Sequence, residues 1–511
     1  MGPHFPKWLQ TQNSYVNLDI SVAGISNVVP DWFWNMSFGR YLNFSHNQMR
    51  GEIPEVSKDL FPKIVDLSHN NFSSPIPLFV FQSEILSISK NMFSGSISYV
   101  CKIPSDFFAS ILDLSDNQLS GKLPNCWKSL TNLIILNLAN NHFRGKIPNT
   151  IGALYQLQTF HLRNNNIMGK LPSSLKNCTT LRMIDLGENK LTGDIPAWIG
   201  THLTRLAGLS LQSNQFHRKI SPTICHLVNI QILDLSINHI SGKIPRCLNN
   251  FTSLVEKNSS IETIPIGEVF FERYVDNVLV QWKGKAIEYR KLGFLKGIDL
   301  SSNMLVGTIP QELSDMKGLI FLNLSRNHLT GNIISSIGQM EMLEWLDLSK
   351  NQLSGEIPTG LANLNYLNIL DLSYNNLTGK IPIGTQLQSS NPSTNGGNNK
   401  LCRRPLAECP QDAPDPSLTD YGKGNNVEED NGFKTREFYF CMALVSFLDS
   451  GLLFLLYFSR THGDMSISTS STMKLPNFDS LNSVRNPNMS TLFICCGTTD
   501  DWGDAGVDVF S

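Results

Sequence analysis

The sequence predicts an α/β-type repeat solenoid with a parallel sheet along its concave face. The first observation is the string L-x-L-x-x-N, with Val, Ile or Phe in some Leu positions, which occurs thirteen times between Leu42 and Asn375. The second is its period, because successive terminal Asn residues are most often 24 residues apart. The third is the string L-x-G-x-I-P, which follows in the same phase. A fixed period of this length is the signature of stacked structural repeats.

Each column of the repeat has a structural role. The alternation L-x-L indicates a short strand with both Leu side chains in the core. The Asn side chain can bond to backbone groups that the turn leaves unpaired. Gly permits the turn, and Pro ends the pairing beyond it. An additional copy from Leu18, with Ala23 in the Asn position, gives fourteen coils, and residues 1–254 form the first block of repeats.

The repeat is interrupted once. Asn238 and Asn303 are 65 residues apart, which is one repeat and 41 extra residues. We therefore predict an island insertion at residues 255–295, followed by four C-terminal repeats at residues 296–388. Long insertions in compact folds are usually functional.

The repeat unit and the island resemble a known plant family. The unit LEWLDLSKNQLSGEIPTGLANLNY, residues 343–366, is similar to the plant-specific leucine-rich repeat, which implies a superhelix. The island resembles that of plant receptor-like proteins without a kinase through the signature WKG-x-x-x-EY, formed by Trp282, Lys283, Gly284, Glu288 and Tyr289. The resemblance implies that these five residues belong to a binding element. The alternative is a loop that only packs on the edge of the solenoid.

The cysteines predict three bridges. Cys101 and Cys126, and likewise Cys225 and Cys247, are separated by about one coil and so lie within disulfide reach. Residues 389–410 resemble the Cys-paired C-terminal cap of the family, which implies a Cys402–Cys409 bridge. Cys178 is expected to be unpaired and buried.

The C-terminal part is predicted to anchor the chain in a membrane. Residues 411–437 form a polar and acidic linker, and residues 438–458 are a mostly apolar run long enough for one transmembrane helix. Asp449 is its one charged residue, and the alternative is a buried amphipathic segment. Residues 459–511 are rich in Ser, Thr and Asn and are predicted to be a short, disordered cytoplasmic tail. They carry no kinase signature.

Glycosylation sequons indicate the secretory pathway, and glycans would solubilise a chain with only 16% charged residues. The sequons before the apolar run are at Asn35, Asn43, Asn71, Asn177, Asn250, Asn258, Asn323 and Asn376. The family resemblance implies a single-pass plasma-membrane protein with its solenoid outside the cell.

The N-terminal segment resembles the interior of a longer protein. MGPHFPKWLQTQ at residues 1–12 and PDWFWNMS at residues 30–37 are similar to the middle of the receptors for a fungal ethylene-inducing xylanase. No signal peptide precedes them. We therefore expect an N-terminally truncated relative of these receptors.

Catalysis and nucleic-acid binding are not expected. The net charge of -2 provides no phosphate-binding surface. Asp66, Ser68 and His69 look like a hydrolytic triad, but the same repeat positions carry other residues elsewhere and no oxyanion hole is specified. No metal-binding, nucleotide-binding or hydrolase motif occurs. We predict no enzyme activity, no cofactor and no metal.

Ligand binding is predicted on the concave face, where the repeats differ most. Arg and aromatic residues are the usual anchors of interfaces. The candidates are His161, Arg163, Arg182, Phe321, Glu344 and Trp345. The predicted function is a cell-surface receptor in plant defence that binds an extracellular peptide or microbial protein and signals through adaptor and co-receptor kinases. The alternatives are a secreted inhibitor of cell-wall-degrading enzymes and a non-functional truncated paralogue.

Overall fold

The computed structural model describes two compact units, Met1–Pro414 and Asp415–Ser511. In the first unit it describes residues 2–409 except 13–14, 57–61, 103–108, 258–277, 283–284, 290–294, 385–386 and 389–390. In the second unit it describes four strands between residues 440 and 495.

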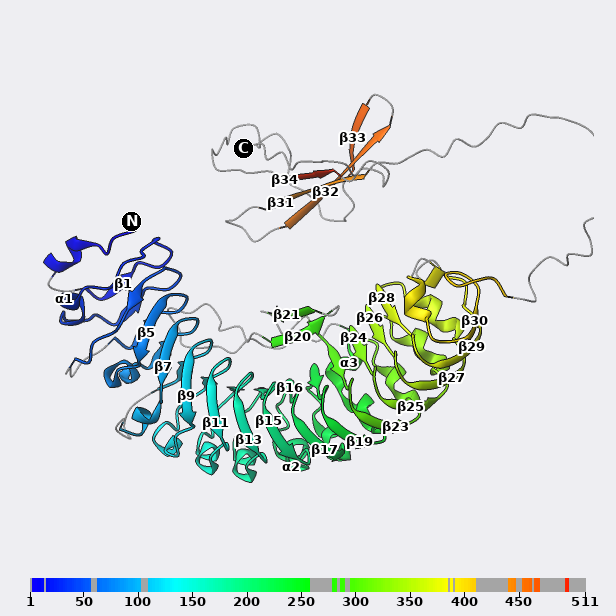
Figure 1. The fold of residues 1–511 in the computed structure, drawn as a ribbon, viewed down its shortest axis with the longest axis horizontal. Coiled ribbons are helices and arrows are strands. Elements are labelled where there is room, and N and C mark those ends of the chain that lie inside the picture. Colours follow the sequence, from blue (N-terminus) through cyan, green and yellow to red (C-terminus); the bar gives the residue numbers. More distant parts are fainter. Residues whose placement is uncertain are drawn as a thin grey trace, which may run out of the picture. The chain divides into compact units, whose positions relative to one another are not determined.

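A parallel sheet of fourteen described strands follows the inner side of the first unit, where β16, β24, β26 and β28 are labelled in Figure 1. The fold class predicted from the repeats is confirmed. The strands are β1 (Asn17–Asp19), β2 (Tyr41–Asn43), β4 (Ile64–Asp66), β6 (Ile85–Ser87), β8 (Ile111–Asp113), β10 (Ile135–Asn137), β12 (Thr159–His161), β14 (Met183–Asp185), β16 (Gly208–Ser210), β18 (Ile232–Asp234), β22 (Gly297–Asp299), β24 (Phe321–Asn323), β26 (Trp345–Asp347) and β28 (Ile369–Asp371).

The register of this sheet keeps each column of the repeat in line. The central residue of every strand is buried and pairs with the central residue of the next, as Leu136 does with Phe160. β18 pairs directly with β22, so that Leu233 lies beside Ile298. The solenoid therefore continues across the sequence position of the insertion without losing a strand.

A second sheet of fourteen described strands is built from the Gly-containing half of the repeat. Its glycines have φ between 76° and 101°, a conformation that other residues rarely adopt. The strands are β3 (Arg50–Gly51), β5 (Asn71–Pro75), β7 (Met92–Gly95), β9 (Gln118–Lys122), β11 (His142–Gly145), β13 (Asn166–Gly169), β15 (Lys190–Gly193), β17 (Gln215–Lys219), β19 (His239–Gly242), β23 (Met304–Gly307), β25 (His328–Gly331), β27 (Gln352–Glu356), β29 (Asn376–Lys380) and β30 (Lys400–Cys402).

Short helices, most of them 3-10, lie on the outer side of the arc, where α2 is labelled in Figure 1. The repeat Pro commonly precedes them in extended conformation, as Pro148 does with ψ 148°. The helices are η1 (Lys7–Thr11), α1 (Asp31–Trp34), η2 (Leu78–Gln82), η3 (Ser98–Lys102), η4 (Trp127–Ser129), η5 (Asn149–Ala153), η6 (Ser173–Asn177), α2 (Trp198–His202), η7 (Pro222–His226), η8 (Arg246–Asn250), α3 (Thr252–Val255), η10 (Gln311–Asp315), η11 (Ser335–Gln339), η12 (Thr359–Asn363) and η13 (Pro392–Asn395).

The repeat Asn residues form a ladder through the core. Asn165 is typical: its Oδ1 accepts the N–H of Phe143 in the preceding coil at 2.9 Å. Its Nδ2 donates to Leu138 O at 3.0 Å and to Leu162 O, in its own turn, at 3.1 Å. The predicted role of the Asn column is confirmed, and each Asn also joins its coil to the coil before it.

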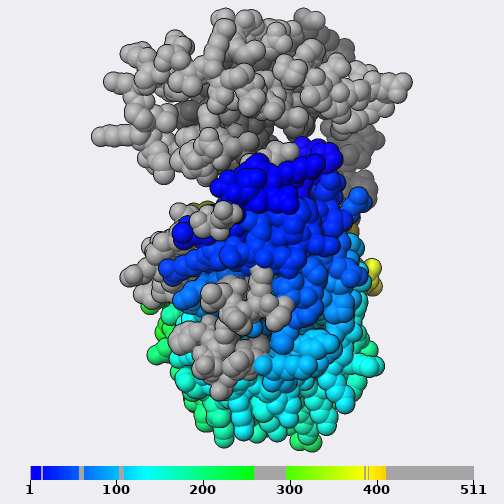
Figure 2. Space-filling view, turned by 90° about the vertical axis from the view of Figure 1, so that its left-hand side faces the viewer, coloured from blue at the N-terminus to red at the C-terminus, as the bar shows by residue number. Residues whose placement is uncertain are grey.

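Aromatic residues fill the N-terminal end of the solenoid, which Figure 2 views end on, with the first coils in blue and later ones in cyan. Phe33, within the PDWFWNMS string, is fully buried. Its ring centroid lies 5.2 Å from those of Phe5 and Phe44 and 5.5 Å from that of Trp34. Edge-to-face pairs of this kind stabilise a core beyond the area that they bury.

All three predicted disulfides are present. Cys101–Cys126 and Cys225–Cys247 each join neighbouring coils, with Cα atoms 5.4 Å and 5.8 Å apart. Cys402–Cys409 closes the C-terminal cap. Cys178 is unpaired and buried, as predicted.

In the second unit the predicted transmembrane helix is not confirmed, and the predicted disordered tail stays a prediction. β31 (Phe440–Ser446) and β32 (Leu453–Thr461) pair antiparallel, and β33 (Asp464–Ser468) and β34 (Leu492–Cys495) pair at either side. The segment between β31 and β32 contains Asp449, Ser450 and Gly451, which favour turns, and the flanking Phe, Tyr and Val residues favour strands. In the described parts of the chain, no helix has the length and apolar character needed to cross a bilayer.

Replacing Asn165 by Ala tests the ladder. The change leaves the buried Phe143 N–H without its acceptor and removes one of the two amide donors to Leu138 O, which keeps Asn141 Nδ2, so we expect a loss of about 1 to 3 kcal/mol in stability. Asn166→Ala at the adjacent exposed position is the matched control and should change stability by less than about 0.5 kcal/mol. Denaturant unfolding followed by circular dichroism measures both. Equal stabilities would contradict the role of the ladder.

Candidate ligand-binding surface

The third residue of each inner strand carries the polar chemistry of the concave face. In most repeats it is Asp or Asn, and its side chain accepts the N–H two residues later, as Asp66 does from Ser68 at 2.9 Å. Asp66 and Ser68 are therefore structural partners in a turn that recurs along the solenoid. This agrees with the sequence interpretation, which rejected a hydrolytic triad there.

Arg163 departs from this pattern and joins three repeats. It occupies a position that is Ser in most other coils, and its side chain is 5% exposed. Its guanidinium lies 3.4 Å from Asp185 Oδ1 and 2.7 Å from Glu188 Oε1, and it also donates to Gln212. Burial alone would lower the pKa of Arg163, but the carboxylates of Asp185 and Glu188 outweigh burial and raise it. Arg163 is thus held charged at the centre of the concave sheet.

Carboxylates accumulate beside Arg163 because the register aligns them. Asp185 pairs with Ser210, Ser210 with Asp234, and Asp234 with Asp299, in strands about 4.8 Å apart. All four side chains are buried. Burial, followed by repulsion from Asp234, raises the pKa of Asp299 from 3.8 to about 7. Burial likewise raises the pKa of Asp234.

Arg163 and the row of Asp185, Asp234 and Asp299 are called the polar centre below. His161 and Arg182 flank it. His161 ends β12 directly beside Asp185 and is 5% exposed. Arg182 precedes β14 and is half-buried. The structure therefore brings His161 and Arg163 together with Asp185, and the sequence analysis did not select Asp185 as a candidate.

Phe321 and Trp345 form a separate aromatic pair in adjacent coils. Their ring centroids are 6.1 Å apart with an interplanar angle of 30°. A methyl group on Gly297 would overlap the Phe321 ring, so the absence of a side chain at Gly297 makes room for this ring. Glu344 adjoins the pair and is half-buried. Both aromatic residues belong to an apolar cluster with Met183, Ile232 and Leu295.

The island residues are described only in part. β20 (Val278–Trp282) and β21 (Lys285–Tyr289) form an antiparallel hairpin in which Trp282 lies opposite Lys285 and Glu288 opposite Leu279. Tyr289 ends β21. Lys283 and Gly284 lie outside the described residues. The binding role of the WKG-x-x-x-EY residues therefore stays a prediction.

The sequons differ in exposure. Five lie at exposed positions, namely Asn35, Asn71, Asn177, Asn250 and Asn376. Asn43 is half-buried and donates to Asp19 Oδ2 at 3.0 Å. Asn323 is 8% exposed and donates to Asp299 Oδ2 at 3.0 Å, so a glycan there would require the concave face to open. Asn258 lies outside the described residues.

Several members of the polar centre were missed by the sequence analysis. Asp234 and Asp299 occur in the common string LDLS or IDLS and look like every other repeat. What distinguishes them is burial and, for Asp234, the charge of Arg163, and neither is visible in the local sequence. Gln212 carries a usable signal, since it replaces the usual Ser of its column.

Comparison with known proteins identifies the family of this chain. The Leucine Rich Repeat family model matches residues 110–130, 132–154, 156–178, 229–251, 318–340, 342–364 and 366–386. Over 461 residues the chain is 55% identical to Receptor-like protein EIX2 and 50% identical to Receptor-like protein EIX1, both of tomato, Solanum lycopersicum. The chain is a leucine-rich-repeat protein of the plant receptor-like family. The matches include 88% of this chain but only 44% of each tomato protein.

Solved structures of plant receptor kinases share the fold of this receptor-like protein. The ectodomain of the Arabidopsis receptor kinase HAESA, in complex with an N-terminally extended IDA peptide hormone, matches with a TM-score of 0.62 and 29% identity. That match covers 78% of this chain and 64% of the HAESA chain. A complex of HAESA with IDA and the co-receptor SERK1 matches with a TM-score of 0.60, covering 78% and 63% of the two chains.

The raised pKa of Asp299 predicts a pH dependence of stability. The unfolded chain holds this proton only below about pH 4, whereas the folded chain holds it up to about pH 7. The folded state binds more protons in this window, so stability falls as the pH rises through it. Thermal unfolding from pH 4 to 8 should show a falling melting temperature, and Asp299→Asn should reduce that slope. Asp194→Asn, at an exposed site, is the control. An unchanged slope in Asp299→Asn would contradict the assignment.

Proposed function

We propose that this receptor-like protein recognises an extracellular peptide or microbial protein on its concave face. The observation that carries the proposal is the concentration there of residues that depart from the repeat: Arg163, which is paired with carboxylates, and the Phe321–Trp345 pair, which lies two and three strands along the sheet from Asp234. Charged centres favour selectivity, and aromatic anchors contribute much of the affinity of protein interfaces.

The island is the second element of the proposed recognition surface. It enters the chain between β18 and β22, which are neighbours in the concave sheet. Both ends of the insertion are therefore tied to the centre of the solenoid, between the Arg163 region and the aromatic pair. We propose that Trp282, Lys283, Gly284, Glu288 and Tyr289 contribute to ligand recognition.

We propose that signalling proceeds through adaptor and co-receptor kinases. The solved HAESA complex, which contains a peptide hormone and a co-receptor, supports an analogous arrangement of ligand and co-receptor kinase. We further propose a role in plant defence and a position in the plasma membrane, and the similarity to the tomato receptor-like proteins supports both.

A binding experiment tests the ligand proposal. The probe is fungal ethylene-inducing xylanase, and the sample is the full chain with an epitope tag in plant cell membranes. We expect saturable binding that Arg182→Glu and Glu344→Lys each weaken about tenfold, because charge complementarity is lost at half-buried concave positions. Lys176→Glu, on the outer helix η6, is the control and should bind normally. Absence of binding excludes this xylanase as a ligand, and equal weakening by Lys176→Glu would contradict the concave location.

The proposed compartment is tested separately. Treatment of the plant-expressed full chain with an N-glycosidase should increase its gel mobility, and Asn71→Gln with Asn376→Gln should abolish part of that shift, since both residues are exposed. The protein should also remain in the membrane pellet after alkaline carbonate extraction. Release by carbonate would favour a secreted inhibitor over a receptor, and the lack of any glycan would argue against the cell surface.

A further inference from the structure

The second sheet carries a strong local excess of positive charge, although the whole chain has a net charge of -2. In β9, β11, β13, β15, β17, β19 and the residue after each repeat Gly, there are eight Lys or Arg residues and one Asp. The Asp is Asp194, which is paired with Arg218 at 3.4 Å. Five of the cations recur at one position of the repeat and form a lysine ladder: Lys122, Lys146, Lys170, Lys219 and Lys243. All five are exposed.

The glycines of the second sheet hold the lysine ladder in order. A methyl group on Gly145 would lie 3.3 Å from Cγ of Lys122, and one on Gly169 would lie 3.1 Å from Cγ of Lys146. Each lysine stem therefore lies over the glycine of the next coil. The apolar stem of each lysine packs on the glycine backbone, while its ammonium group stays in water. Side chains aligned in this way lose less conformational freedom when they bind a ligand.

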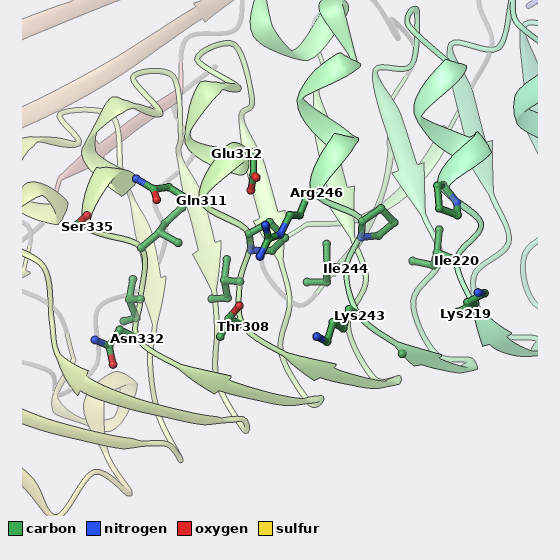
Figure 3. A pocket seen from close by; sticks show the side chains of 17 residues that line it. Lys219, Ile220, Lys243, Ile244, Arg246, Thr308, Gln311, Glu312, Asn332 and Ser335 are labelled. Atoms are coloured by element: carbon green, nitrogen blue, oxygen red, sulfur yellow. The ribbon is translucent and has the colours of Figure 1, made fainter.

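A groove of about 910 Å³ extends along the C-terminal end of the ladder (Figure 3). One edge is formed by equivalent residues of successive coils, Lys219, Lys243, Thr308 and Asn332. Arg246 and Gln311 lie on the opposite edge, and buried isoleucines such as Ile244 lie between the two edges. The groove thus follows the repeat direction and crosses the strands, which is the shape needed for an extended polymer.

The polar side chains beside the ladder favour a carbohydrate over a lipid surface. The first residues of the strands include Gln118, His142, Asn166, Gln215 and His239, all exposed and able to bond to hydroxyl groups. Met168 is the one exposed large hydrophobic side chain on these six described strands, so little could insert into a bilayer. The same strands carry no sequon, whereas Asn71 and Asn376 lie on strands nearer the two ends of the solenoid.

We propose that the lysine ladder and the adjoining groove bind a linear acidic polysaccharide, a polyuronate with one carboxylate on each sugar. The ammonium groups pair with the carboxylates, and the neighbouring Gln, His and Asn side chains bond to the sugar hydroxyls. This surface lies on a different sheet from the concave ligand surface. The receptor-like protein would therefore be held in an extracellular matrix while its concave face stays available to another ligand.

Binding of the full chain to immobilised, de-esterified polygalacturonate tests the proposal. We expect Lys146→Glu, Lys170→Glu and Lys219→Glu together to weaken binding at least tenfold, and 0.5 M salt to weaken binding of the parent chain, because exposed charges are screened. The control exchanges the same number of charges on the outer side of the same region, with Lys128→Glu, Lys176→Glu and Arg205→Glu, and should bind like the parent. Circular dichroism melting verifies that both triple variants fold.

Two further probes identify which anion binds, and one further variant tests whether the lysine ladder and the concave face bind independently. Fully methyl-esterified polygalacturonate should not bind, and vesicles of phosphatidylserine should bind much more weakly than polygalacturonate. Arg182→Glu should retain polygalacturonate binding, so failure of the xylanase proposal would leave this result intact. The proposal is overturned if the folded ladder variant binds like the parent, if the control loses binding equally, if the esterified polymer binds as well, or if vesicles bind best.

Discussion

The solenoid depends on the hydrogen bonds of one buried side chain, the repeat Asn. A coil with only three residues in its inner strand leaves most of its turn without sheet partners, and water cannot reach those groups. Each Asn amide accepts from one N–H in the preceding coil and donates to carbonyl groups in both coils, as Asn165 does. The same hydrogen bonds therefore join neighbouring coils and pair the backbone groups of the turns. The other columns of the repeat owe their alignment to this stacking, including the buried concave carboxylates and the exposed lysine ladder.

Repetition explains why so much of the fold could be predicted. Leu, Asn and Gly recur in columns, and each column has one physical role, so the strands, the ladder, the turns and the coil-to-coil disulfides could all be expected from the sequence. The residue before each Asn was not foreseen: it has φ between 51° and 55° in thirteen coils, even where it is Ile237. No side-chain preference indicates this conformation, because the hydrogen bonds on either side impose it. The described strands β31 and β32 in the apolar run were not foreseen either.

The candidate site was predictable only where a residue broke the repeat. His161, Arg163, Phe321 and Trp345 differ from their columns and could be selected for that reason. Asp185, Asp234 and Asp299 match their columns, and they become unusual only because parallel pairing without register shift places them in one buried row that begins at Asp185, the partner of Arg163. The lysine ladder was overlooked for the same reason: a single Lys at this position looks like part of the consensus, and its significance arises because five of six consecutive coils carry one.

Because β18 pairs directly with β22, the sequence of the island can change without altering the stacking of the solenoid. Because β18 and β22 pair in the same register as any other neighbours, the described island strands β20 and β21 join neither of the two long sheets of the solenoid. Lengthening such an excursion costs only a slowly growing loop-closure entropy. New sequences can therefore be sampled at this one point without disturbing the curvature, the core or the charged columns. A solenoid built in this way can accept new sequence in one segment while its repeats keep their geometry.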